Sequence, residues 1–358
     1  MSLPTLVVIH GRDRRWPDQA SLARAWETSL RAGLRHVGAP WADDLPMRFV
    51  DYGAGWRDLG QPDDVSAVQA EFATELLERT GDEGAAPAPW SIWSGVAGLV
   101  DALGQQAGID DPAVLELFLN DLAEYFRDGN GRASANGAVA AEAGAAEGDV
   151  ILLAHGVGSI ASYVSLANAG ESLGQVRGLV TFGSPLGMDA VRTRVDAIAP
   201  GVPFPAAPRR WINIFDELDF AATVPRLEPI FRALDGRRVE DEAVADQRQP
   251  GAGRGRAHDP SRYFGSIDFA SRLQQLISEL DPTLEASLAA QVPAAQPASE
   301  EPAAEPGTVA REAEAPATRS WPGAPSPPGA APPWLDGAAP PWVDGAAPPW
   351  LDPDEDEK

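Results

Sequence analysis

Short apolar runs alternate with amphipathic stretches over the first 280 residues of the chain. Uninterrupted runs rich in β-branched and aliphatic residues predict buried strands, which are Leu6–Ile9, Met47–Tyr52, Val150–Ala154, Val176–Phe182 and Trp211–Phe215. Apolar positions at helical spacing predict helices, which are Ser21–Leu34, Ala113–Phe126, Ser159–Asn168 and Phe269–Leu280. Strands separated by helices indicate the α/β class, with a doubly wound, mainly parallel sheet covered on both faces.

The segment between the second and third predicted strands, residues 53–148, is longer than a simple crossover. It contains an apolar stretch with Trp90, Ile92, Trp93, Val96, Leu99, Val100 and Leu103. One interpretation is a cap-like helical insertion at about residues 53–130, which would cover a pocket for an apolar acyl or ester ligand. The other is an ordinary core helix, and the sequence favours neither.

The composition changes near Pro282. Residues 281–358 hold half of the 34 prolines and carry 14 acidic but only 3 basic residues, which predicts a disordered tail after a folded domain at 1–280. The tail repeats the unit Gly-Ala-Ala-Pro-Pro-Trp-Leu/Val-Asp three times, placing Trp334, Trp342 and Trp350 at regular intervals. Pro-Pro favours an extended helix that displays these side chains, so we expect a protein partner; repeat duplication without function is the alternative.

Charge and composition exclude several classes of function. The formal net charge of −25 argues against binding to nucleic acid or to anionic membranes. The absence of Cys excludes disulfides, thiol nucleophiles and Cys-ligated metals. No apolar run approaches the ~20 residues that span a bilayer, and the first residues do not resemble a secretory signal, so we expect a cytoplasmic protein without a membrane span. No His and carboxylate spacing indicates a metal, and we expect no cofactor.

The segment Asp149–Ile160 is the most informative part of the chain. An apolar strand runs into a tight turn of small residues and then into a helix, which is the pattern of a nucleophile elbow. In such an elbow the turn raises one side chain above the sheet. The backbone N–H that follows it and the helix N-terminus then favour a developing oxyanion.

With this elbow the chain resembles the α/β-hydrolase superfamily, in a bacterial lipase- and esterase-like branch. Members of that branch carry Ala-His-Ser-x-Gly-Ser at the elbow, whereas this chain has Ala154-His155-Gly156-Val157-Gly158-Ser159, with Gly where the nucleophilic Ser would stand. Five other segments resemble the branch in the family order, and they are Val7–Asp13, Phe118–Phe126, Leu179–Gly187, Trp211–Asp219 and His258–Tyr263.

The resemblance implies roles for particular residues. Asp219 would be the acid and His258 the base, whereas Asp216 would shape the loop. The oxyanion hole would comprise Gly11, Arg12 and Val157, and the ligand pocket would include His10 and His155. Position 156 would be that of the nucleophile, yet glycine has no side chain that can attack a substrate.

These roles leave three hypotheses for function. The favoured one is a catalytically impaired pseudo-hydrolase that binds a ligand or acts as a scaffold, with the tail recruiting partners. The alternative is an active ester or lipid hydrolase that uses another nucleophile or activated water, although we expect the nearby hydroxyls of Ser159 and Ser184 to be structural. The third is an interaction module whose pocket has lost its function. A substitution made to trap a ligand would give the same sequence.

Overall fold

The computed structural model describes residues 3–10, 18–53, 56, 66–80, 95–127, 129–169, 172–201, 203–244 and 254–280. The chain divides into two units, Met1–Pro293 and Ala294–Lys358, and every described residue belongs to the first. The tail with its three Trp repeats therefore lies outside the described residues. The same is true of Gly11, Arg12, Trp90, Ile92 and Trp93.

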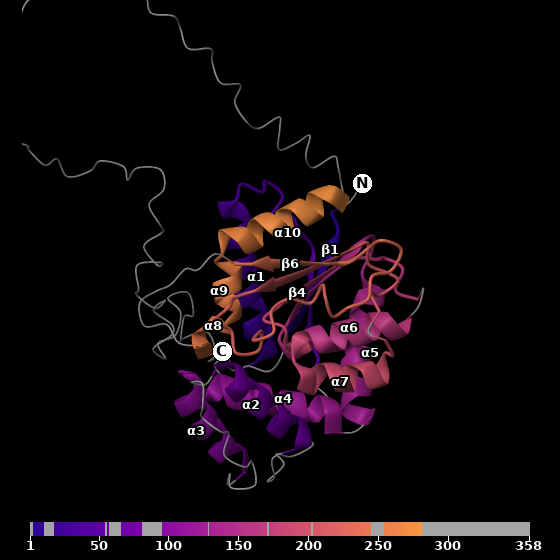
Figure 1. The fold of residues 1–358 in the computed structure, drawn as a ribbon. Coiled ribbons are helices and arrows are strands. Elements are labelled where there is room, and N and C mark those ends of the chain that lie inside the picture. Colours follow the sequence, from indigo (N-terminus) through magenta and orange to yellow (C-terminus); the bar gives the residue numbers. More distant parts are fainter. Residues whose placement is uncertain are drawn as a thin grey trace, which may run out of the picture. The chain divides into compact units, whose positions relative to one another are not determined.

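The described strands form one sheet in which all neighbours are parallel, in the order β2-β1-β3-β4-β5-β6 (Figure 1). Their bounds are Thr5–His10 for β1, Met47–Asp51 for β2, Val150–His155 for β3, Val176–Phe182 for β4, Arg210–Phe215 for β5 and Val239–Ala243 for β6. The prediction of an α/β fold with a parallel sheet is thus confirmed. The sequence did not predict β6.

The four central strands β1, β3, β4 and β5 bury side chains on both faces of the sheet, as β3 illustrates. Val150, Leu152 and Ala154 belong to one apolar cluster, and Ile151 and Leu153 belong to the other. Helices cover both clusters because a parallel sheet must bury both of its faces.

The helices divide between these two clusters (Figure 1). The first cluster packs against α2 (Ala67–Thr80), α3 (Gly95–Ala107), α4 (Pro112–Arg127), α5 (Gly129–Ala145), α6 (Val157–Ala169) and α7 (Asp189–Ile198). The second packs against α1 (Gln19–His36), α9 (Pro260–Phe264) and α10 (Ile267–Leu280). The short α8 (Arg254–Ala257) precedes α9, and a 3-10 helix covers Pro185–Gly187.

The order of the strands creates a switch point between β1 and β3. The chain moves from β1 outward to β2, and it later returns to place β3 on the other side of β1. Ligands of open α/β sheets bind where neighbouring connections leave in opposite directions, beyond the carboxyl ends of the strands. The residue that follows β3 at this position is Gly156.

Candidate functional site

Gly156 forms the tight turn between β3 and α6. Its φ of +54° lies in the left-handed region that favours glycine, and its carbonyl oxygen accepts a hydrogen bond from the N–H of Ser159 at 3.0 Å. Gly158 lets the helix approach the sheet, because a Cβ there would lie 2.9 Å from Cγ2 of Ile9. The small residues of the segment therefore permit a sharp strand-to-helix turn.

The structure brings Gly156, His258 and Asp219 together. His258 lies between α8 and α9, and its Nδ1 is 2.9 Å from Oδ1 and 3.1 Å from Oδ2 of Asp219, in the loop after β5. On the other side of the imidazole ring, Nε2 lies 3.3 Å from the point that a Cβ of residue 156 would occupy. A side chain at position 156 would thus meet the nitrogen that is not bonded to Asp219.

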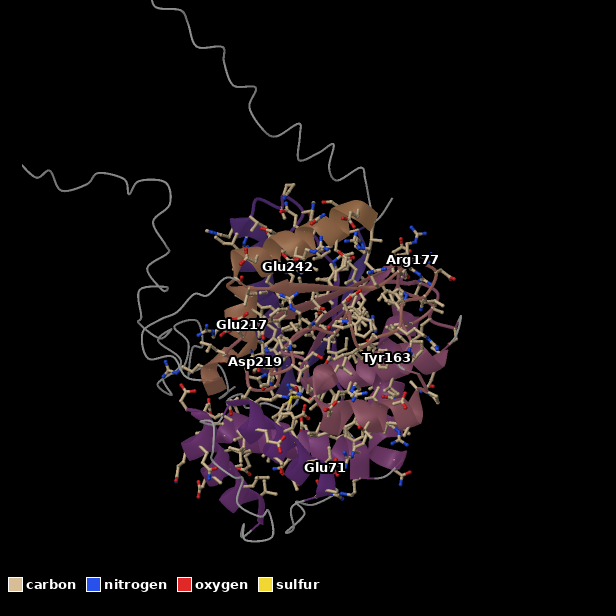
Figure 2. All side chains as sticks on the ribbon, in the orientation of Figure 1. Glu71, Tyr163, Arg177, Glu217, Asp219 and Glu242 are labelled. Atoms are coloured by element: carbon tan, nitrogen blue, oxygen red, sulfur yellow. The ribbon has the colours of Figure 1, made fainter. Side chains whose placement is uncertain are left out.

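Three groups hold the Asp219 carboxylate in place. Besides His258, the hydroxyl of Tyr263 donates to Oδ2 at 2.7 Å and the N–H of Ala221 donates to Oδ1 at 2.8 Å. Figure 2 marks Asp219, which is fully buried. Burial would raise the pKa of Asp219, but the charge of His258 and the hydrogen bonds from His258 and Tyr263 outweigh it, so this pKa is lowered. The group is therefore a carboxylate that accepts the Nδ1 proton.

Tyr263 is a site residue to which the sequence analysis assigned no role. Its hydroxyl also accepts the N–H of Asp216 at 3.2 Å, so it joins the loop after β5 to α9. Asp216 itself accepts the N–H of Leu218 and forms an ion pair with Arg262. The only signal for Tyr263 in the sequence was its place in the segment His258–Tyr263.

His155 and His10 occupy different surroundings. The ring of His155 packs against that of His258 at a tilt of 33°, with centroids 4.4 Å apart, and its Nε2 has no hydrogen-bond partner within the described part of the chain. His10 packs against Trp26 at 5.5 Å and Phe49 at 6.2 Å. The structure thus places the ring of His155 in contact with the imidazole of His258.

Aromatic side chains surround the imidazole of His258. Phe220 lies 4.7 Å from it and Phe118 of α4 meets it edge-on at 5.4 Å, both measured between ring centroids. Phe72 of α2 packs against Phe118 at 5.2 Å. Helices from the segment between β2 and β3 therefore contribute an apolar wall to the site.

The two nearby hydroxyls are engaged with each other and with the backbone. Oγ of Ser159 donates to the carbonyl of Gly156 at 2.5 Å and lies 2.8 Å from Oγ of Ser184, which in turn accepts the N–H of Leu186. Both side chains are buried. The hydroxyl of Ser159 is therefore occupied by the carbonyl of Gly156 and the hydroxyl of Ser184.

The other predicted site residues divide between described and undescribed parts of the chain. Val157 is the first residue of α6 and is buried, whereas Gly11 and Arg12 lie outside the described residues. Within the described ranges, no three His, Asp or Glu side chains are grouped to hold a metal ion. Among those same residues, no helix has the length and apolar character needed to cross a bilayer.

The neutral state of His155 makes the stability of the protein sensitive to acid. Burial, and then the charge of His258, lower the pKa of His155 to about 3 from 6.5. Below pH 6.5 the unfolded chain binds a proton at this residue and the folded chain does not. We expect this to remove about 2 kcal/mol of unfolding free energy between pH 6.5 and about pH 5.

Urea denaturation at several pH values measures this loss. His155→Leu, which keeps the site apolar, should flatten the dependence of stability on pH over this interval. The matched control is His36→Leu, because His36 is exposed at the end of α1. Equal pH dependence in the unaltered chain and in His155→Leu would contradict the assignment.

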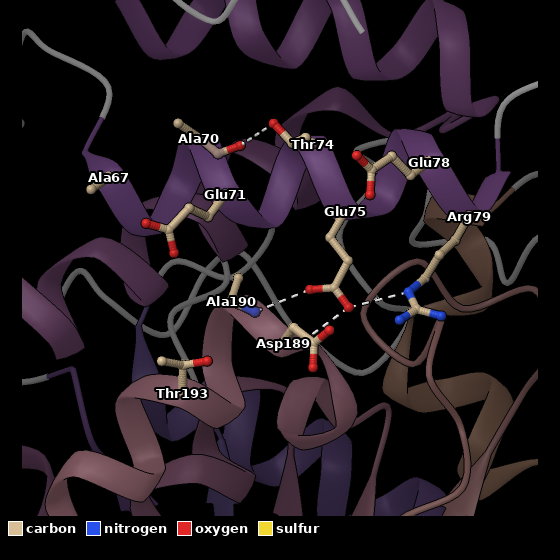
Figure 3. Close-up of a pocket in the computed structure, with 10 residues that line it drawn as sticks. All are labelled: Ala67, Ala70, Glu71, Thr74, Glu75, Glu78, Arg79, Asp189, Ala190 and Thr193. Carbon is tan, nitrogen blue, oxygen red and sulfur yellow. Dashed lines mark hydrogen bonds and ion pairs between the residues drawn. The ribbon is translucent and has the colours of Figure 1, made fainter. Parts of the chain in front are cut away.

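A separate cleft of about 760 Å³ lies between α2 and α7 (Figure 3). None of the predicted site residues lines it. At its edge the carboxylate of Glu75 accepts the N–H of Asp189 at 2.9 Å and the N–H of Ala190 at 3.0 Å. Glu75 thereby caps the N-terminus of α7, whose own N-cap residue Met188 supplies no side-chain hydrogen bond.

Glu75→Ala should destabilise the fold by about 1–3 kcal/mol, because two backbone N–H groups lose a charged acceptor. Glu78→Ala is the matched control, since Glu78 is an exposed residue of the same helix that lines the same cleft. Thermal and urea denaturation of both variants measure the difference. Similar stability of the two would show that Glu75 is not needed to cap α7.

Comparisons of the chain with models of protein families, with curated proteins and with solved structures find no significant match. Function must therefore be inferred from the chemistry of the site. Its defining feature is an ionised Asp219 paired with His258, whose second ring nitrogen faces a residue without a side chain.

Proposed function

We propose that this chain is an α/β-hydrolase-like protein that keeps an acid and a base but lacks the nucleophile, and that it binds an apolar acyl or ester ligand instead of cleaving it. One observation carries the proposal. A Cβ at position 156 would lie 3.3 Å from Nε2 of His258, while Nδ1 is bonded to Asp219. A serine at this position would therefore carry its hydroxyl next to an imidazole held by a carboxylate, which is the arrangement in which it could lose its proton.

The chemistry of acyl transfer explains why such a protein would bind without turnover. A nucleophile must form a bond to the acyl carbon while its proton passes to a base. Gly156 presents only hydrogen, and losing a nucleophile lowers the rate by several orders of magnitude. The engagement of Ser159 with Gly156 and Ser184 supports the view that neither hydroxyl replaces it.

The aromatic side chains of the helices between β2 and β3 favour a ligand that is apolar. Phe118 of α4 lies against the imidazole of His258, and Phe72 of α2 lies against Phe118. We therefore propose that this segment acts as a cap over the site. Leu99, Val100 and Leu103 of α3 are buried in the same apolar cluster, so the segment also contributes to the core.

The intact pair of His258 and Asp219 favours a second candidate, slow ester hydrolysis by water. Nε2 of His258 would accept a proton from water as its oxygen attacks the acyl carbon, and the leaving alkoxide would then take up that proton. This candidate requires measurable ester hydrolysis that disappears in His258→Ala.

A fluorophosphonate probe tests the main proposal. The unaltered chain should not be labelled. Gly156→Ser should be labelled, because Oγ would displace fluoride from phosphorus while its proton passes to His258. Gly156→Ala, which adds a Cβ without a hydroxyl, is the matched control and should not react. Labelling of the unaltered chain would contradict the proposal, and so would a folded Gly156→Ser variant that does not react.

We also propose that the three repeats of the tail bind a protein partner. Each copy retains Trp, Leu or Val, and Asp, and Pro-Pro favours an extended chain that displays them. Affinity capture with the full chain should recover a partner that is lost when Trp334, Trp342 and Trp350 are changed to Ala. Deleting residues 321–358 should have the same effect. An unchanged set of captured proteins would exclude recruitment by the repeats.

A further inference from the structure

A chain of hydrogen bonds joins the loop after β4 to the turn at Gly156, and we call it the serine chain. It begins at the N–H of Leu186, which donates to Oγ of Ser184 at 3.3 Å. Oγ of Ser184 lies 2.8 Å from Oγ of Ser159, which donates to the carbonyl of Gly156 at 2.5 Å. Ser159 is 0% and Ser184 is 3% exposed, so these bonds are shielded from exchange with water.

The number of protons determines the direction of the serine chain. A serine hydroxyl has one proton to donate. Ser159 gives its proton to the carbonyl of Gly156, so the proton between the two hydroxyls must come from Ser184. All the donors therefore point toward the carbonyl of Gly156, and hydrogen bonds aligned in this way polarise one another.

Other backbone hydrogen bonds restrain Gly156 as well. Its carbonyl also accepts the N–H of Ser159 at 3.0 Å, and its own N–H donates to the carbonyl of Phe182, the last residue of β4, at 3.2 Å. Glycine restricts its own backbone less than any other residue does. The direction of the peptide groups at this turn therefore depends on the hydrogen bonds that hold them.

Holding the carbonyl of Gly156 also directs the N–H of Val157. The two groups belong to one planar trans peptide unit, in which they point in opposite directions. Val157 is the first residue of α6, so its N–H has no acceptor within the helix. In an elbow, the N–H that follows the nucleophile position donates to the oxygen of the acyl group. The serine chain thus acts on the group that would meet a ligand.

From this geometry we propose that Ser159 and Ser184 are positioning residues that together orient the N–H of Val157 toward the carbonyl oxygen of an acyl or ester ligand. Ser184 acts through Ser159, and Ser159 acts through the carbonyl of Gly156. The loop after β4 then supports both parts of the site, because a Cβ at its Gly183 would lie 2.7 Å from Oδ2 of Asp219. The inference rests on the proposed function, since it assigns residues that support binding at that same site.

Fluorophosphonate labelling of the Gly156→Ser chain tests the inference, because the phosphoryl oxygen gains negative charge as Oγ attacks phosphorus. Ser159→Ala in that chain should lower the second-order rate constant about tenfold or more, since a misdirected donor stabilises this charge less well. Ser184→Ala should lower it by a smaller factor, because Ser159 keeps its own bond to Gly156. Ser162→Ala is the matched control and should leave the rate unchanged. Oγ of Ser162 is equally buried in α6 but donates to the carbonyl of Gly158, at 2.8 Å.

A double variant distinguishes positioning from a general loss of packing. Because Ser184 acts through Ser159, adding Ser184→Ala to Ser159→Ala should lower the rate no further. The loss should lie in the maximal rate of labelling and not in the affinity for the probe, because the charge develops only during the reaction. Thermal unfolding establishes that each variant is folded. Additive losses, or a folded Ser159→Ala variant that reacts as fast as its parent, would overturn the inference.

The amide signal of Val157 gives a measurement that needs no reaction. In the full chain with nitrogen-15 valine, this signal is identified by its absence from Val157→Leu. Its proton resonance should shift in Ser159→Ala and in Ser184→Ala but not in Ser162→Ala, and an unshifted signal in both of the first two would overturn the inference. Shifts without labelling of a folded Gly156→Ser variant would support the serine chain and overturn the hydrolase-like proposal. Labelling that does not depend on either serine would do the reverse.

Discussion

Replacing Asp219 by Asn in the Gly156→Ser chain should slow its labelling by fluorophosphonate by about 10³–10⁴-fold. The carboxylate accepts the Nδ1 proton of His258 and so leaves Nε2 able to take the proton of the new hydroxyl. An Asn amide can instead donate to Nδ1, which favours the tautomer with a proton on Nε2. The second-order rate constant of labelling, measured at several probe concentrations, gives the effect.

Asp216→Asn in the same Gly156→Ser chain is the matched control. Asp216 lies in the same loop, but its carboxylate accepts the N–H of Leu218 and pairs with Arg262. We expect less than a tenfold loss of rate from this change. A similar loss in both variants would mean that Asp219 acts only through the structure of its loop.

Tyr263→Phe distinguishes the orientation of Asp219 from its charge. The change removes the 2.7 Å hydrogen bond to Oδ2 but leaves the carboxylate and its bond to Nδ1. Groups that orient a functional side chain typically contribute a factor of about 10–100. In the Gly156→Ser chain, the rate of fluorophosphonate labelling should therefore fall less with Tyr263→Phe than with Asp219→Asn.

Much of the fold could be predicted because its strands are short, apolar and continuous. Val176–Phe182 forms β4 with the predicted bounds, and the predicted run Val150–Ala154 extends by one residue to His155. The turn at Gly156 was predictable for a similar reason, because small residues directly after a buried strand permit a sharp change of direction. The local pattern therefore predicts this turn without reference to any tertiary contact.

The elements that were missed depend on distant residues. β6 consists of Val239–Ala243 and carries Glu240, Asp241 and Glu242, so it has no apolar run. Glu240 forms ion pairs with Arg210 of β5 and Arg272 of α10, and Arg272 also pairs with Glu242. An edge strand can carry such charges because one of its sides remains unpaired.

Contacts between distant polar groups, both in the candidate site and at the start of α7, were missed for the same reason. The bond from Tyr263 to Asp219 joins residues 44 positions apart, and the cap that Glu75 provides for α7 spans 114 positions to Asp189. Neither partner is marked by periodicity or composition. Spacing along the chain predicts elements, but it does not predict which polar side chains meet when those elements pack.

Gly183→Ala should destabilise the protein by about 2–4 kcal/mol, because it combines backbone strain with a steric clash at the acid. Gly183 follows β4 with a φ of +53°, where a side chain is unfavourable. A Cβ there would lie 2.7 Å from Oδ2 of Asp219 and 3.0 Å from Nε2 of His155. Urea denaturation at pH 7 measures the loss in unfolding free energy.

Gly38→Ala separates the two contributions. Gly38 has a φ of +81°, but a Cβ there would meet no atom within 4 Å, so its replacement should cost only about 1–2 kcal/mol of strain. The excess cost at Gly183 then measures how tightly Asp219 and His155 enclose this loop. If that excess is present, Gly183→Ala should also slow the labelling of Gly156→Ser, because Asp219 must move to admit the methyl group. Equal costs at the two glycines would mean that the carboxylate of Asp219 has room to shift. A carboxylate that can shift would hold His258 too loosely to direct Nε2 at residue 156.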